Sequence, residues 1–371
     1  MKFLVSTLIY LLPALLLITP ETGVAEADDT KIPVLYCTDL FHPHDDPDDH
    51  FDLACLYAMP EVDIKAIILD QGAKQQEKPG RIPVAQMNRL TGREVPAATG
   101  LAEPLKSPED TGKQQPEPYQ EGVETILSVL RKSSRPVTVV AVGSLRDIAA
   151  AYNRKPKLCQ KKIAKLCIFI GEAGTDFREY NVNLDVHAYR RVMNAPLPVY
   201  WVPCFDGGIW VNNGNASFWQ AKQEHLLAGT ANPVLNFFLY MFRHEGAEDP
   251  AAALFESPPQ EEKERVFAET RNLWCCAVFP WLAGRTYHLR EGACRAVPRE
   301  ALQPGDMLVE PFGFVPVAVQ VDENGRASYG DAAAVRKVQR FQVNKEHPYA
   351  ECMTSVTNGL LRELSRSISR P

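Results

Sequence analysis

The stretch CTDLFHPHDDPDDHFDLACLYAMPEVDIKAIILDQG, from Cys37 to Gly72, contains a strand end, a helix and a second strand around one acidic turn. The apolar run IPVLYCTDL enters the turn, FDLACLYAM has apolar residues at helical spacing, and VDIKAIILDQG resembles a buried strand. Six aspartates, which repel one another at neutral pH, lie in and beside the turn: Asp39, Asp45, Asp46, Asp48, Asp49 and Asp52. Such a concentration of negative charge between two apolar segments needs a physical reason.

The same alternation continues along the chain. Strand-like and helix-like segments follow one another as PVTVVAVGS, LRDIAAAYNR, KLCIFIGEAG, DVHAYRRVMNA and LPVYWVPCF. These units predict an α/β fold, an open and mostly parallel β-sheet flanked by helices on both faces, Rossmann-like in outline. Beyond Tyr287 the pattern changes to strands with a hairpin signal at Glu323-Asn324-Gly325, which predicts a small C-terminal β section. Ligands of such sheets bind beyond the carboxyl ends of the strands, where Asp39 is expected.

The first residues predict export. Lys2 precedes an apolar run from Phe3 to Ile18, and Ala25-Glu26-Ala27 is a small-x-small cleavage pattern. We expect a signal peptide over residues 1–27, cleaved after Ala27, one domain over residues 28–371, and a secreted or periplasmic protein. An uncleaved membrane anchor is the alternative, although the run is short for a span of roughly 20 residues. No later segment is apolar enough to cross a membrane, so no membrane partner is expected after signal removal.

Charge and cysteine content narrow the possible partners. The net charge of -6 gives no indication of nucleic-acid binding. The nine cysteines do not form a metal-binding pattern, because Cys275 and Cys276 are adjacent and the others are scattered. An exported protein can form disulfides, but the odd count leaves at least one thiol unpaired within the chain, and the pairing stays open. A homo-oligomer is compatible with the sequence, which does not decide the oligomeric state.

Crowded carboxylates have three physical explanations: a hard cation neutralises them, they share protons, or water solvates them. Asp39 at a strand end, with Asp48 and Asp49 entering a helix, can converge on one Ca²⁺ ion, which takes roughly six to eight oxygen ligands. Solvation alone suits Asp45 and Asp46, but it suits Asp39 poorly because Asp39 directly follows a buried strand. Interleaved histidines leave a transition-metal alternative open: His42, His44 and His50.

Three segments, in this order, resemble the inosine-uridine preferring nucleoside hydrolase family. Cys37-Thr38-Asp39 followed by Asp46-Pro47-Asp48-Asp49 is similar to the family's DTDxGxDDxxAL start, which reads DPDD in some branches. VAVGSLRDIAAAY is similar to its TGPLTNIA segment, and REYNVNLDVHAYRRV is similar to its AEFNIYxDPEAA segment. The resemblance spans about Ile32 to Val202 and implies the family's fold.

Carried over to the matching positions, the resemblance implies a calcium site and a ribose site. Asp39 would bind the ion and orient or deprotonate a bound water, with Asp49 and the Val142 carbonyl as further ligands. Asp48 would accept hydrogen bonds from ribose hydroxyls and could touch the metal. Two polar residues on an extended segment would hold the sugar: Glu179 and Asn181. The implied activity is calcium-dependent hydrolysis of the N-glycosidic bond of ribonucleosides or related N-ribosides by a metal-activated water, with a small-molecule nucleoside as substrate.

The C-terminal signature departs from the family. The family has a His-Asp pair opening a helix, whereas the best counterpart here, ETRNLWCCAVFPWLAG, puts Arg271 and Asn272 in those places. Asn272 would be a neutral metal ligand, and Arg271, cationic at any working pH, would stabilise an anionic leaving group as a catalytic residue. Trp274, beside this pair, is a candidate for stacking on a base, with core or rim packing as the alternative. The acidic turn is also longer than the family's, with eight residues between Asp39 and Asp48.

These departures leave two other functions open on the same fold. One is a non-catalytic protein that binds ribose or nucleosides, and the other is a hydrolase of a different glycoside. The retained carboxylates of the acidic turn favour hydrolysis, whereas the Arg271-Asn272 replacement favours the alternatives. The sequence does not specify the leaving group.

Overall fold

The computed structural model describes residues 30–174, 177–243, 247–329 and 337–368. The chain divides into two units, Met1–Thr30 and Lys31–Pro371, and the fold is that of the second unit. The expected signal peptide lies outside the described residues. Within them, no helix combines the length and the apolar character that a membrane crossing requires.

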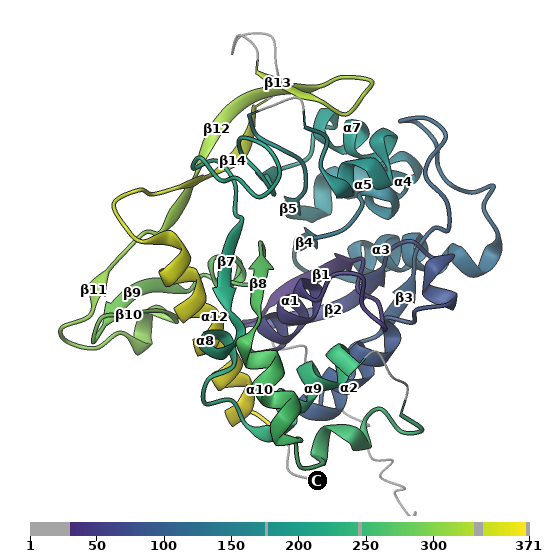
Figure 1. Cartoon of the computed structure of the whole chain (residues 1–371). Helices are drawn as coiled ribbons and strands as arrows, with labels where there is room; N and C mark the ends of the chain where they lie inside the picture. The colour runs from purple at the N-terminus through teal and green to yellow at the C-terminus, as the bar shows by residue number, and fades with distance from the viewer. Residues whose placement is uncertain (1–29, 175–176, 244–246, 330–336, 369–371) are drawn as a thin grey trace, which may run out of the picture. The chain divides into compact units, whose positions relative to one another are not determined.

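The described residues form a nine-stranded central sheet with the strand order β13-β12-β14-β6-β5-β4-β1-β2-β3 (Figure 1). The strands from β14 to β3 pair in parallel, and β12 and β13 are added antiparallel at one edge. Their bounds are β1 Ile32–Thr38, β2 Val62–Leu69, β3 Ala97–Thr99, β4 Val137–Ala141, β5 Ile163–Phe169, β6 Val199–Val202, β12 Phe312–Val321, β13 Ala327–Tyr329 and β14 Lys337–Val343.

Helices cover both faces of this sheet, which explains the unbroken apolar runs of the sequence. Successive side chains of a strand point to opposite faces, so Val34 and Tyr36 of β1 enter one core while Leu35 and Cys37 enter the other. The first core also contains apolar residues of α1 (Asp48–Tyr57), α2 (Arg81–Thr91), α9 (Asn232–Arg243), α11 (Phe279–Leu282) and α12 (Tyr349–Arg366). The second core contains those of α3 (Glu121–Lys132), α4 (Arg146–Arg154), α5 (Pro156–Lys162) and α7 (Val186–Asn194).

The later part of the chain adds two small antiparallel sheets. One contains β9 (Thr286–Arg290), β10 (Ala293–Val297) and β11 (Met307–Leu308), and the other pairs β7 (Trp219–Lys222) with β8 (Thr270–Leu273). A disulfide between Cys294 and Cys352 joins β10 to α12. The remaining helices are α6 (Tyr180–Leu184), α8 (Gln223–Leu227) and α10 (Gln260–Ala268). The predicted fold class is confirmed, including the C-terminal β section and the hairpin between β12 and β13.

Candidate active site

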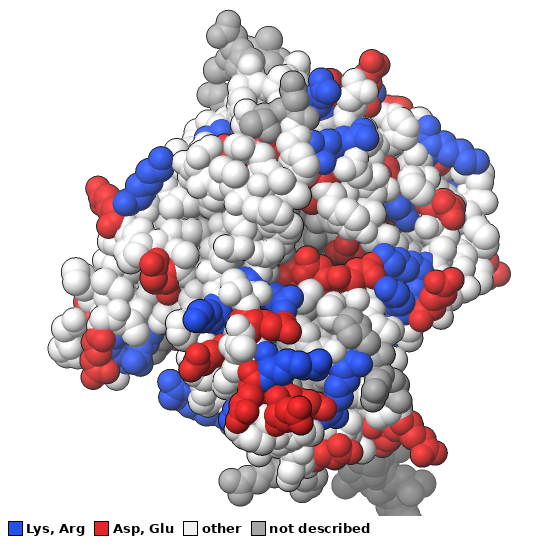
Figure 2. All heavy atoms as spheres, viewed as in Figure 1, with Lys and Arg blue, Asp and Glu red and all other residues white. Residues whose placement is uncertain are grey.

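The carboxyl ends of the central parallel strands meet at a pocket of about 430 Å³. Asp39 follows β1, Val142 follows the neighbouring strand β4, and the amide of Val142 donates to the carbonyl of Cys37 at 2.9 Å. Asp48 and Asp49 begin α1. The pocket is lined by Asp39, Asp45, Asp46, Asp48, Asp49, Val142, Phe169, Phe177, Glu179, Tyr180, Asn181, Cys204, Phe205, Ile209, Trp210, Trp274 and Cys275. In Figure 2, acidic side chains gather beside a hollow near the centre of the view.

Asp39, Asp48 and Asp49 form an acidic cluster that makes no ion pair within the described residues, although the Arg271 guanidinium interacts electrostatically with Asp48. Burial and the neighbouring carboxylates raise the pKa of all three. Asp49 is buried, and its Oδ1 accepts a hydrogen bond from the Thr38 hydroxyl at 2.6 Å. The nearby lysines, Lys74 and Lys78, pair instead with Asp45, which is exposed. Partly buried negative charge of this kind is costly unless a cation or protons neutralise it.

The turn after β4 is shaped to receive the Asp39 carboxylate. A Cβ added at Gly143 would lie 2.8 Å from Asp39 Oδ1, so only glycine leaves room for that carboxylate. Asp70, at the end of β2, fixes the same turn by accepting from the Ser144 amide at 2.8 Å and from its hydroxyl at 2.9 Å. The position of the Val142 carbonyl is therefore set by three strand ends at once.

The two residues expected to hold the sugar both line the pocket, but not on an extended segment. Glu179 caps α6: Oε1 accepts from the Asn181 amide at 2.8 Å, and Oε2 accepts from the Gly171 amide at 3.0 Å and the Val182 amide at 3.3 Å. Asn181 lies inside α6, and its Nδ2 donates to the Val142 carbonyl at 2.9 Å. The expectation of an extended segment was therefore wrong, because the glutamate carboxylate starts a helical turn. Both side chains therefore also stabilise the backbone around the pocket through these hydrogen bonds.

Arg271 and Asn272 do not line the pocket. Both lie in β8, where Asn272 Oδ1 accepts from Gln220 Nε2 of β7 at 2.8 Å. The Arg271 guanidinium pairs with Glu269 at 2.8 Å and lies 5.1 Å from the centre of the Phe242 ring. The residues that this segment contributes to the lining come three positions later, Trp274 and Cys275. The described residues 270–275 therefore contribute no carboxylate to the pocket lining.

The aromatic cluster of the pocket was only partly recognised in the sequence. Phe205 lies 6.0 Å from Phe177, 5.5 Å from Trp210 and 5.9 Å from Trp274 between ring centres, and the two tryptophans are 6.1 Å apart. Trp274 is mostly buried and donates from Nε1 to the Cys204 carbonyl at 3.2 Å. Phe177 and Phe205 carried no sequence signal, because neither lies in a motif. The glycine pair before Trp210 was the one visible hint of a loop at the pocket.

Oxygens dominate the donor set available to a metal, because burial raises the pKa of the two lining thiols, Cys204 and Cys275, and so disfavours their thiolate forms. Among the described residues, no three His, Cys, Asp or Glu side chains lie close enough together to hold an ion by themselves. The Asp39 and Asp49 carboxylates and the Val142 carbonyl nevertheless offer the oxygen ligands that Ca²⁺ takes. All three histidines of the turn make aromatic contacts, His42 with Tyr240, His44 with Phe242 and His50 with Phe237. The chemistry of the donor set therefore fits a hard cation better than a transition metal.

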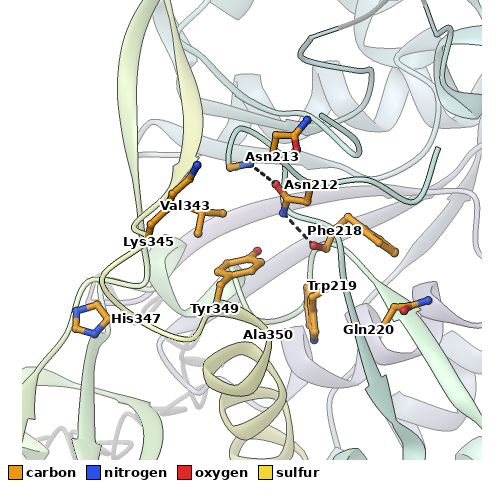
Figure 3. A pocket seen from close by; sticks show the side chains of 11 residues that line it. Asn212, Asn213, Phe218, Trp219, Gln220, Val343, Lys345, His347, Tyr349 and Ala350 are labelled. Carbon is orange, nitrogen blue, oxygen red and sulfur yellow. Dashed lines mark hydrogen bonds between the residues drawn. The ribbon is translucent and has the colours of Figure 1, made fainter. Parts of the chain in front are cut away.

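A second pocket, of about 690 Å³, lies between the loop around Asn212 and the segment that enters α12 (Figure 3). Its lining contains Lys345 and His347 but no carboxylate. Phe218 lines this pocket and also packs on Trp210 and Trp274 of the aromatic cluster. Because it lacks the acidic cluster, this second pocket is not the candidate active site.

A pocket with carboxylates and aromatic rings at the carboxyl edge of a parallel sheet lies where small-molecule sites of open α/β folds are found. The family model of the inosine-uridine preferring nucleoside hydrolases matches residues 44–362. The chain belongs to this family, as the sequence motifs predicted. The expected enzyme class, a hydrolase acting on N-glycosyl compounds, is confirmed by this membership.

Curated relatives include pyrimidine-specific ribonucleoside hydrolases named RihA. The one from Citrobacter koseri is 31% identical over 242 residues, covering 58% of this chain and 73% of the relative. One from Escherichia coli is 30% identical over 189 residues, covering 45% of this chain and 58% of the relative. Similar solved structures include an inosine-uridine preferring nucleoside hydrolase from Bacillus anthracis and a plant nucleoside hydrolase. The first has a TM-score of 0.51 and 13% identity over 90% of this chain and 99% of that one. The second has a TM-score of 0.53 and 15% identity over the same shares. At such identities the structural likeness shows the fold alone.

Proposed function

We propose that this protein hydrolyses the N-glycosidic bond of ribonucleosides or related N-ribosides, with Ca²⁺ or a similar hard cation at the acidic cluster. The observation that carries the proposal is the composition of one pocket, which combines unpaired carboxylates with an aromatic cluster. A ribose is polar and hydroxyl-rich, whereas a base is flat and stacks on rings. The two groups of lining residues match the two halves of such a substrate.

The residues of the chain supply the polar part of the mechanism. Asp39, a carboxylate that follows β1 and lines the pocket, is suited to take a proton from an attacking water. Asp48 and the Asn181 amide can bond to ribose hydroxyls, and the carboxylates stabilise positive charge that develops on the sugar ring. The ion, when bound by Asp39, Asp49 and the Val142 carbonyl, would neutralise the cluster and lower the pKa of a water.

The described pocket lining offers the leaving group no side chain that is cationic at neutral pH. None of the described residues that line the pocket is a histidine, lysine or arginine, although the lining includes the phenol of Tyr180, whose pKa is raised by burial. Because such a phenol is a weak acid, leaving groups with a low proton affinity should depart fastest. The absence of a cationic side chain from the described lining also supports a second candidate function, a protein that binds nucleosides without hydrolysing them.

Comparing leaving groups tests the proposal. With calcium present, we expect slow but measurable release of ribose from inosine and uridine, which carry the N-glycosidic bond. Release of 4-nitrophenol from 4-nitrophenyl riboside, an O-riboside with a better leaving group, should be faster. Asp39→Asn should lower kcat on the nitrophenyl substrate by about 10²–10⁴-fold, the usual contribution of a general base. Asp249→Asn, which alters a carboxylate that caps an exposed turn, is the matched control. Tight nucleoside binding without turnover of any substrate would favour the binding protein instead.

We also infer that the protein is exported. The disulfide between Cys294 and Cys352 supports this, because such bonds persist mainly in oxidising compartments. The N-terminus of the mature protein, determined by mass spectrometry, should be Asp28. A cytosolic protein that retains Met1 or the apolar run would contradict this inference.

A further inference from the structure

The turn that brings Trp210 to the pocket is closed by its own backbone. The Val211 amide donates to the Gly208 carbonyl at 3.1 Å, which makes Ile209 and Trp210 the two central residues of a β-turn. At its base, the Asp206 amide donates to the Val211 carbonyl at 2.9 Å. Ile209 and Trp210 are about half exposed and both line the pocket, so this turn forms part of the pocket wall.

Trp210 has a backbone conformation that bulky residues rarely adopt. Its φ is 62°, in the left-handed region, at the turn position where glycine or asparagine is usual. The ring is about half exposed and lies on the edge of the first core, where it contacts three core members, Phe205, Phe218 and Trp274. Backbone strain of this kind often accompanies a functional side chain.

Glu172 holds this turn from outside the pocket. It follows β5, is buried, and its Oε1 accepts from the Gly207 amide at 2.7 Å and the Gly208 amide at 3.2 Å. Its Oε2 accepts from the Gly174 amide at 3.0 Å. Gly207 and Gly208 have φ values of 110° and 107°, which only glycine adopts readily, and both amides can therefore face one carboxylate oxygen.

We propose that Glu172 is a positioning residue that fixes the 207–211 turn, so that Trp210 forms a rigid wall against a flat leaving group. The inference rests on the proposed function, because it assigns Trp210 to the leaving group of the same substrate. Glu172 touches no substrate and acts only through the turn. A carboxylate is required because both of its oxygens accept from backbone amides, whereas a glutamine would turn its NH₂ group toward one of these donors.

The test combines amide exchange with ligand binding. Glu172→Gln should speed hydrogen exchange in a peptide covering residues 206–213 by about tenfold, because the turn loses its acceptors. It should weaken uridine binding about tenfold, as loss of one stacking ring does, and change ribose binding less than twofold. Asp110→Asn is the matched control, since Asp110 also accepts from two backbone amides in a loop outside the pocket lining, and it should change neither.

A double-mutant cycle separates positioning from a general loss of structure. In the Trp210→Ala background, Glu172→Gln should weaken uridine binding by less than twofold, because the ring that it positions is gone. Equal effects in both backgrounds, or a parallel loss of ribose binding, would overturn the inference. If the wild type binds neither uridine nor ribose, the proposed function fails. In that case the exchange measurement still decides whether Glu172 fixes the turn. Unchanged exchange of residues 206–213 in Glu172→Gln would overturn this role, and faster exchange would support it.

Discussion

The carboxylates of the acidic cluster lie at the ends of a strand and a helix, whereas the rings of the aromatic cluster lie in connecting segments. Asp39 follows a strand that is buried on both faces, and Asp48 and Asp49 open a helix packed on the sheet. Phe205 and Trp210, in contrast, lie in the long connection between β6 and β7. The difference indicates two roles: strand and helix ends fix the carboxylates, and loops shape the aromatic side of the pocket for the leaving group.

Removing a carboxylate from the acidic cluster should have the largest effect. Asp49→Ala should weaken calcium binding at least about 100-fold, because calcium affinity depends on the number of charged ligands and few are present here. Isothermal titration of chelator-treated protein measures this. Unchanged calcium affinity in the variant, or tighter binding of zinc than of calcium, would show that these carboxylates do not hold a hard cation.

Removing a ring of the aromatic cluster should weaken binding of the base and leave calcium binding unchanged. Trp274→Ala should weaken uridine binding about tenfold, within the 1–3 kcal/mol of a base–aromatic stacking contact, while calcium affinity changes less than twofold. Trp274→Phe keeps an aromatic ring and should retain most of the binding. Because Trp274 is mostly buried, circular dichroism and Tm must show that both variants are folded. A variant that loses calcium and uridine together would show that the two clusters are not separable.

The smallest effects are expected in β8. Arg271→Ala and Asn272→Asp should each change calcium affinity and nucleoside binding less than about threefold, because both side chains lie outside the pocket lining and bond to neighbours on β7 or just before β8. Their titration curves should overlay that of the wild type. Markedly tighter calcium binding by Asn272→Asp would show that residue 272 lies close to the metal site.

The sequence could predict the acidic cluster because strand ends are specified locally. Asp39 follows an unbroken apolar run, and parallel strands put their carboxyl ends at one edge. The Val142 carbonyl was predicted only from the resemblance of VAVGSLRDIAAAY to the family's TGPLTNIA segment. Arg271 and Asn272 lie outside the pocket lining because β8 is short and pairs with β7 outside the main sheet, so the alternation of strands and helices did not predict where their side chains lie. Trp210 reaches the pocket through a left-handed turn held by Glu172, a contact between distant loops that no local pattern encodes.

Calcium titration of the wild-type protein at about pH 5 and about pH 8 tests the central claim most directly, namely that the acidic cluster holds a hard cation. Burial and mutual repulsion raise the pKa of Asp39, Asp48 and Asp49, so at the lower pH the ion must displace protons from them. As the pH rises through these raised pKa values, the carboxylates become charged and the affinity should increase. One calcium site that binds clearly more tightly at pH 8 is the predicted result. No binding at either pH, or an affinity independent of pH, would contradict the account.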